Sequence, residues 1–307
     1  MNLRSPYVLL VTATCLWGGN FVVGKVLVTE VPPILLATIR WCIALLALVP
    51  FWGRAMWSQR KIMTAHWKTV LFLGLTGVAG FNTLTYVAVQ YTGSINASLM
   101  NAATPALIIL ISMAVLRERV SATVIPPILL SIVGVLWIIS RGSWQAFTNL
   151  TFNAGDLWMV AAVICWSFYS VGMKKAAGKF SANALFFWQI VVAVIVLLPA
   201  AVIETVVRQP ELHFSVGLIS GLLFIGVLAS LVAFTAWNQA IAMIGPSRCA
   251  GFLNLIALFS AIFALTFTGE RIHLYHLLGA ALVLAGVYAS NRALKAAPNP
   301  STTRVMD

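Results

Sequence analysis

The chain alternates between long apolar runs and short polar or basic connections over nearly its whole length. Most runs have about 20 residues, the length that an α-helix needs to cross the hydrocarbon core of a bilayer. The runs are continuously apolar and lack the period-two alternation of membrane strands, so the pattern favours helices over a barrel of strands. It predicts spans at residues 7–27, 34–52, 68–91, 94–116, 123–140, 156–175, 183–203, 215–242, 246–268 and 273–291.

Part of the second half of the sequence aligns with part of the first half when it is shifted by 152 residues. Arg117-Glu118-Arg119 ends one apolar run and Gly134-Val135 follows, whereas Gly269-Glu270-Arg271 ends another and Gly286-Val287 follows at the same distance. Other identical pairs at this shift are Phe72 and Phe224, Gly74 and Gly226, Thr83 and Thr235, Ala88 and Ala240, and Gly93 and Gly245. In a membrane chain, such a duplication is typical of transporters whose substrate site lies between two halves.

Lysine and arginine are concentrated in alternate connections. With the N-terminus in the cytoplasm, the outer connections keep only Lys25, Arg141, Arg208 and Arg271. The positive-inside rule therefore predicts a multi-pass protein of the cell inner membrane with both termini in the cytoplasm. Because five spans is an odd number, the second half enters the membrane from the opposite side, and the repeat is inverted.

These observations predict the fold class, an all-α membrane protein in which ten transmembrane helices form two five-helix inverted repeats around a central cavity. The expected parts are a first repeat at 1–140, a connector at 141–155, the second, inverted repeat at 156–292 and a cytoplasmic tail at 293–307. An inverted repeat allows two related conformations, each open to one side, which is the geometric basis of alternating access.

Composition agrees with lipid as the solvent, since 61% of residues are hydrophobic, 8% are charged and the mean hydropathy is +0.97. The formal charge of +12 does not indicate a nucleic-acid partner, because the cations lie in short loops and form no basic face. We expect no metal or cofactor, since no CxxC motif, Cys/His cluster or Walker motif occurs.

Amides and aromatic residues recur inside the predicted spans, where polar groups are unfavourable unless they find partners or water. Aromatic faces suit flat apolar groups, and neutral amides can serve both ends of a zwitterion. Interfacial anchoring and helix–helix hydrogen bonding remain an equal alternative for each single residue. The candidate substrate-binding residues are Trp17, Asn20, Asn82, Tyr86, Asn101, Trp166, Tyr169, Trp237, Asn238 and Asn254.

Arg40 is the one cation well inside an apolar run. A ligand site and a side chain that snorkels to the surface explain it equally well. Glu118 and Glu270 fit helix caps or partners of neighbouring arginines better than proton carriers. The middle of the spans holds no Asp or Glu, which favours facilitated transport over proton coupling.

The two five-span halves, the Leu16-Trp17-Gly18-Gly19-Asn20-Phe21 stretch and the repeated Glu-Arg motifs resemble the EamA-type drug/metabolite transporters from Tyr7 to Asn291. The aromatic content, with tryptophans at 17, 166 and 237, resembles that of the bacterial aromatic amino-acid exporters of the YddG type. The resemblance implies a ten-helix basket whose cavity is lined by spans 1, 3, 4, 6, 8 and 9. The chain departs from a strict repeat at Pro105, which has Ala257 opposite it, so a bend is expected in span 4 alone.

The predicted function is export of aromatic or neutral amino acids and related small metabolites. A multidrug or nucleotide-sugar-like carrier of the same superfamily is the alternative, and a membrane-embedded transferase ranks below both because no catalytic acid/base cluster is evident. The expected partners are a small-molecule substrate and the lipid bilayer. Monomer and dimer both remain open.

Overall fold

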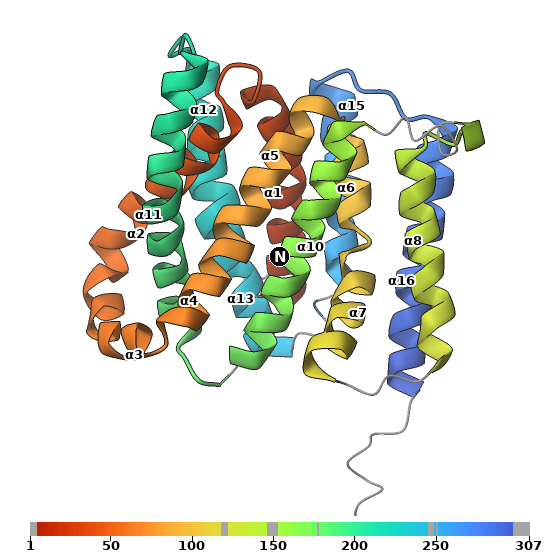
Figure 1. The fold of residues 1–307 in the computed structure, drawn as a ribbon, viewed down its shortest axis with the longest axis horizontal. Helices are drawn as coiled ribbons and strands as arrows, with labels where there is room; N and C mark the ends of the chain where they lie inside the picture. The colour runs from red at the N-terminus through yellow and green to blue at the C-terminus, as the bar shows by residue number, and fades with distance from the viewer. Residues whose placement is uncertain are drawn as a thin grey trace, which may run out of the picture.

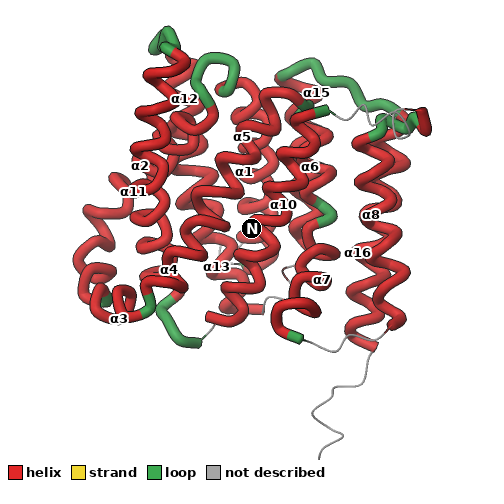
Figure 2. Tube along the Cα trace, viewed as in Figure 1, coloured by secondary structure: helices red, strands yellow, loops and turns green. Residues whose placement is uncertain are grey.

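The computed structural model describes residues 5–117, 122–145, 153–176, 178–244, 249 and 251–296, and the side chains of 51–52, 238, 241–242, 251, 291 and 294–296 are outside its description. Over these ranges the chain forms helices and loops without a strand (Figure 2). The helices stand roughly alongside one another as a bundle (Figure 1). The α-helices are α1 (Pro6–Leu27), α2 (Pro33–Ser58), α3 (Arg60–Ala65), α4 (Trp67–Leu73), α5 (Phe81–Tyr91), α6 (Ser94–Asn101), α7 (Thr104–Leu116), α8 (Ile125–Ile139), α10 (Ala154–Ala176), α11 (Ala182–Arg208), α12 (Val216–Leu223), α13 (Ala233–Ile244), α15 (Leu255–Phe267) and α16 (Leu274–Ala296).

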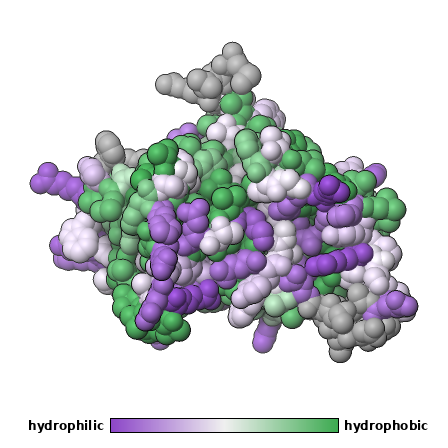
Figure 3. Space-filling model, turned by 90° about the horizontal axis from the view of Figure 1, so that it is seen from above, coloured by the Kyte–Doolittle hydropathy of each residue, from purple (hydrophilic) through white to green (hydrophobic). Residues whose placement is uncertain are grey.

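By length and composition, seven helical segments of the described chain can cross a membrane, or eight if the bent pair α6–α7 counts as one span. Two shorter apolar helices, Phe252–Phe267 and Leu274–Ser290, coincide with the last two predicted spans. Large apolar side chains such as Leu46, Ile195 and Tyr288 are exposed on the bundle, as lipid contact requires. Hydrophilic side chains gather instead on the end of the bundle seen in Figure 3.

Two spans contain π-helical segments, at Gly74–Gly80 between α4 and α5 and at Phe224–Val232 between α12 and α13. A π-helical turn disturbs the regular bonding of backbone carbonyls, which side chains can then satisfy. Asn82 Nδ2 donates to Gly77 O at 3.3 Å and to Val78 O at 3.0 Å, and Ser230 Oγ donates to Ile225 O at 2.8 Å. Polar side chains in these spans therefore have a definite structural task.

The break between α6 and α7 follows from Pro105, as expected for span 4. The helices meet at 40° across Ala102 and Ala103. Proline has no N–H to donate to the carbonyl four residues earlier, which is that of Asn101. The Thr104 hydroxyl donates to this carbonyl at 2.5 Å instead. At the aligned position of the second half, a 3₁₀ turn at Gly251–Asn254 leads into α15.

Helices α8 and α16 form a close pair at one edge of the bundle (Figure 1). Gly134 lies against the backbone of Gly279 and Val283, and Gly286 lies against the backbone of Pro127 and Ser131. Ser131 Oγ donates to Val283 O at 3.0 Å. Residues later in α16 contact residues earlier in α8, so the two helices run antiparallel. The glycines permit their close approach.

We predict that Gly286→Ala lowers the melting temperature of the purified protein in detergent. A Cβ at this position would lie 2.4 Å from Ser131 Oγ and 2.5 Å from Pro127 O, so the helices must separate. Such overpacking destabilises a protein by about 1–3 kcal/mol. The matched control is Gly217→Ala in α12, because this helical glycine is exposed and its nearest neighbour would lie 3.7 Å from the added Cβ. Equal melting temperatures for the two variants would contradict close packing of α8 on α16.

Candidate functional site

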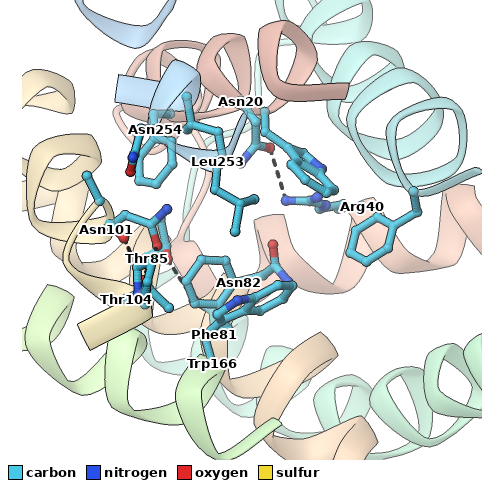
Figure 4. A pocket seen from close by; sticks show the side chains of 16 residues that line it. Asn20, Arg40, Phe81, Asn82, Thr85, Asn101, Thr104, Trp166, Leu253 and Asn254 are labelled. Atoms are coloured by element: carbon cyan, nitrogen blue, oxygen red, sulfur yellow. Dashed lines mark hydrogen bonds between the residues drawn. The ribbon is translucent and has the colours of Figure 1, made fainter. Parts of the chain in front are cut away.

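A cavity lies between the helices beside the α6–α7 break and the 3₁₀ turn, and the helices that follow the two π-helical segments, α5 and α13, also reach it (Figure 4). Side chains from α1, α2, α5, α6, α7, α10, α13 and α15 and the 3₁₀ turn line it. Its aromatic lining residues are Trp17, Phe21, Phe81, Trp166 and Phe234. Its polar lining residues are Asn20, Arg40, Asn82, Thr85, Asn101, Thr104 and Asn254.

Six of the ten candidate residues from the sequence line this cavity: Trp17, Asn20, Asn82, Asn101, Trp166 and Asn254. Their spacing along the chain did not show that they meet, because they come from five different elements of the bundle. The structure also brings Phe81, Thr85 and Phe234 to the cavity wall. Helical periodicity gave no reason to prefer Phe81 and Thr85 over other residues of the same span, whereas Phe234 shares a face with Trp237 at helical spacing.

Three of the other four candidates are described, and they do not line the cavity. Tyr86 and Tyr169 are buried behind the lining residues, where their hydroxyls have partners within the protein. Trp237 packs on Trp17, with ring centroids 5.4 Å apart, and does not reach the cavity. The side chain of Asn238 is outside the described part of the structure.

The cavity has two aromatic walls. Trp166 packs on Phe81 from α5, with ring centroids 4.8 Å apart. On the other wall, Trp17 and Phe234 pack in a T-shaped arrangement with ring centroids 5.3 Å apart, and Trp17 Nε1 donates to Ala229 O at 3.1 Å. Since each ring is held by a second ring or by a backbone carbonyl, the walls are preformed for a flat apolar group.

The amides differ in how much bonding capacity they keep for a ligand. Asn82 uses its Nδ2 on carbonyls of the π-helical segment, and no described residue donates to its Oδ1. Asn101 Oδ1 accepts only a long bond of 3.3 Å from Thr104 Oγ1. Asn254 Oδ1 is enclosed by protein and has no hydrogen-bond partner among the described residues. Asn82 and Asn101 thus offer carbonyl oxygens next to aromatic rings, whereas the oxygen of Asn254 is not open to the cavity.

Arg40 brings a positive charge to the cavity wall from α2, a helix that was not expected there. Its side chain is 1% exposed, so it does not snorkel to the surface. Nε donates to Ser230 Oγ at 2.8 Å, and Nη1 donates to Asn20 Oδ1 at 3.0 Å and to Tyr86 Oη at 2.9 Å. The sequence held the signal, a lone cation within an apolar run, but could not say which way the side chain pointed.

A second polar cluster joins helix ends beside α6. Glu270 accepts from Ser94 N at 2.8 Å, Ser94 Oγ at 2.7 Å and Ile95 N at 3.1 Å, and so caps α6 from the loop after α15. This is the capping role expected of Glu270, whereas Glu118 is outside the described residues. Two residues before Ser94, Thr92 donates from Oγ1 to the buried carboxylate of Asp156 at 2.6 Å. Among the described residues, no group of three or more His, Cys, Asp or Glu could hold a metal ion.

Known proteins resemble this chain over nearly its full length. A protein of Archaeoglobus fulgidus named "Uncharacterized transporter" is 26% identical over 290 residues, covering 94% of this chain and 97% of its own. The "Probable amino-acid metabolite efflux pump" of Salmonella typhimurium is 24% identical over 292 residues, covering 93% and 94%. A solved crystal structure shares this fold with a TM-score of 0.59 at 17% identity, covering 95% of this chain and 98% of its own.

The sequence model of the EamA-like transporter family matches residues 4–140 and 153–292. These two ranges include every element that lines the cavity. The chain is therefore a membrane transporter that belongs to the EamA-like transporter family.

Proposed function

We propose that this protein exports aromatic or neutral amino acids and related small metabolites across the cell inner membrane by alternating access. The cavity is the observation that supports this proposal most directly, because it combines preformed aromatic walls with free amide oxygens and the buried cation of Arg40. An aromatic side chain fits the walls, and a zwitterionic head group fits the polar lining. The name of the Salmonella relative agrees with this substrate class.

We infer that ten spans in two inverted five-helix halves underlie this transport. A shift of 149 residues aligns the starts of α2 and α11, Pro33 and Ala182, and the internal prolines Pro50 and Pro199. The shift of 152 aligns the two π-helical segments. The two shifts differ by three residues because the stretch that joins the second span to the third is three residues longer in the second half than in the first.

Reciprocal contacts also support an inverted relation. Ser131 and Val283 are 152 residues apart and bond to each other. Gly134 contacts Gly279 and Val283, and the aligned Gly286 contacts Pro127 and Ser131, which are their counterparts at the same shift. Self-matching contacts between antiparallel helices are what a twofold axis in the membrane plane produces.

Aligned residues meet again at the cavity. Asn82 and Phe234, Asn101 and Leu253, and Thr104 and Ile256 all line it, and each pair is related by the shift of 152. Trp17 and Trp166 do so at the shift of 149. This supports a cavity between the two halves, as alternating access requires, with a specificity set where the halves differ.

The alternative carriers fit less well. A nucleotide-sugar carrier must neutralise phosphates, but Arg40 is the only charged residue among the described residues that line the cavity. A transferase needs an acid/base pair near its substrate, and the described lining residues include no Asp, Glu or His. The positive-inside distribution supports cytoplasmic termini, with the Glu270 cap on the outer side.

We predict that Trp166→Ala and Asn82→Ala reduce the export of preloaded L-tryptophan from liposomes. Loss of one ring's apolar contact is worth about 1.5–3 kcal/mol, which corresponds to a tenfold loss of flux or more. The controls are Trp158→Ala, an exposed tryptophan of the same helix α10, and Asn183→Ala, an exposed amide of α11. Wild-type flux no faster than in protein-free liposomes would refute the substrate, and unchanged flux in both cavity variants would place the site elsewhere.

We also predict that tryptophan flux proceeds without an imposed pH gradient, because no described lining residue is an acid or a histidine. Asp156 is the competing proton carrier, since it is buried and its Oδ2 has no partner among the described residues. Asp156→Asn should therefore retain flux down a tryptophan gradient. A wild-type protein that needs a pH gradient, together with an Asp156→Asn variant that no longer responds to one, would show coupled transport instead.

A further inference from the structure

Arg40 is a buried cation whose charge is unopposed in the described structure. All three acceptors that it uses, on Asn20, Tyr86 and Ser230, are neutral. The guanidinium carbon lies 5.0 Å from the ring centroid of Trp41, which gives a weaker, cation–π contact. Removing a charge from water is unfavourable unless an opposite charge compensates it. The site is therefore electrostatically incomplete without an anion.

The chain's own carboxylates do not supply that anion in the described structure. Glu270 caps α6, and Asp156 bonds to Thr92. Glu204 accepts from Leu35 N and pairs with Arg208, the one ion pair formed among described residues. Glu30 and Glu211 lie in connections at the ends of helices. None of these five makes a bond to Arg40.

The hydrogen bonds of Arg40 leave one side of the guanidinium available. Nε–H and both N–H groups of Nη1 are used by Ser230, Asn20 and Tyr86. No described residue accepts from Nη2, which has two N–H groups. Because Arg40 lines the cavity, an oxygen of a bound molecule can accept these bonds (Figure 4).

The aligned position in the second half shows that bracing the helices does not require a charge. At the shift of 149, Arg40 corresponds to Gln189 and Asn20 corresponds to Tyr169. Gln189 Oε1 accepts from the Tyr169 hydroxyl at 3.4 Å, and its side chain is fully buried. A neutral glutamine thus links α11 to α10 as Arg40 links α2 to α1. The charge at position 40 needs a further explanation.

We propose that Arg40 binds the carboxylate of the transported molecule through Nη2. This rests on the proposed function and narrows it to substrates that must carry a carboxylate, so that amines and amides of the same shape are rejected. The aromatic walls then hold the side chain, and the bound carboxylate provides the charge that Arg40 lacks. Arg40 is accordingly a specificity-determining residue.

The test compares L-tryptophan with L-tryptophanamide, which keeps the ring and the ammonium but lacks the carboxylate. Binding to the purified wild-type protein in detergent is measured by calorimetry or by the shift in melting temperature. We expect the amide to bind about 10- to 100-fold more weakly, the range given by losing one charge-assisted hydrogen bond. This comparison requires no variant to fold.

Arg40→Gln, which copies the aligned residue of the second half, should lose this preference by weakening tryptophan binding 10- to 100-fold and leaving amide binding nearly unchanged. Arg208→Gln is the matched control, because its side chain is 47% exposed at the end of α11. If Arg40→Gln does not fold, Arg40→Lys serves in its place and should retain carboxylate preference with reduced affinity.

The outcomes separate the two proposals. Wild-type protein that binds or moves neither tryptophan nor its amide would overturn the proposed substrate class, and this inference with it. Wild-type protein that transports tryptophan but binds the amide equally well would overturn the role of Arg40 alone. The same conclusion follows if Arg40→Gln folds and keeps the wild-type preference.

Discussion

In a lipid environment every backbone carbonyl and N–H must find its partner inside the protein, and this constraint governs how the helices of the chain can bend. The spans are interrupted by π-helical segments and by Pro105, which disturb the regular helical bonding. Asn82, Ser230 and Thr104 bond to carbonyls at these places. Asn82 and Thr104 also line the cavity, and Ser230 holds Arg40. The side chains that make irregular helices tolerable in lipid are thus the ones that shape the site.

Arg40 connects this arrangement to the rest of the bundle. Its bonds join α2 to α1, to α5 and to the π-helical segment that precedes α13. Any movement of these elements relative to one another must change the surroundings of the guanidinium. Substrate binding at Arg40 would therefore be felt by several helices at once, which is the kind of differential contact that couples a ligand to a conformational change.

The ends of the helices add a second constraint on that change. Glu270 ties the loop after α15 to the first turn of α6, and the Trp17 indole ties α1 to the segment before α13. Both ties join segments that we assign to different halves. Glycines at the α8–α16 contact provide a compact pair at the bundle edge. Alternating access would keep such packed pairs intact and exchange bonds such as the Glu270 cap.

The sequence by itself determined the membrane environment, the helical class and the family, because about 20-residue apolar runs and a shift of 152 do not depend on three-dimensional contacts. It also singled out Trp17, Asn82 and Asn254, which line the cavity, since amides and aromatics are conspicuous inside apolar spans. Tertiary structure alone decided which of these meet at one cavity. Tyr86 was equally polar and equally central, but its hydroxyl is taken by Asn20 and Arg40, which holds it behind the wall. The direction of Arg40 was likewise fixed by packing, because residues from three other segments of the chain supply its acceptors.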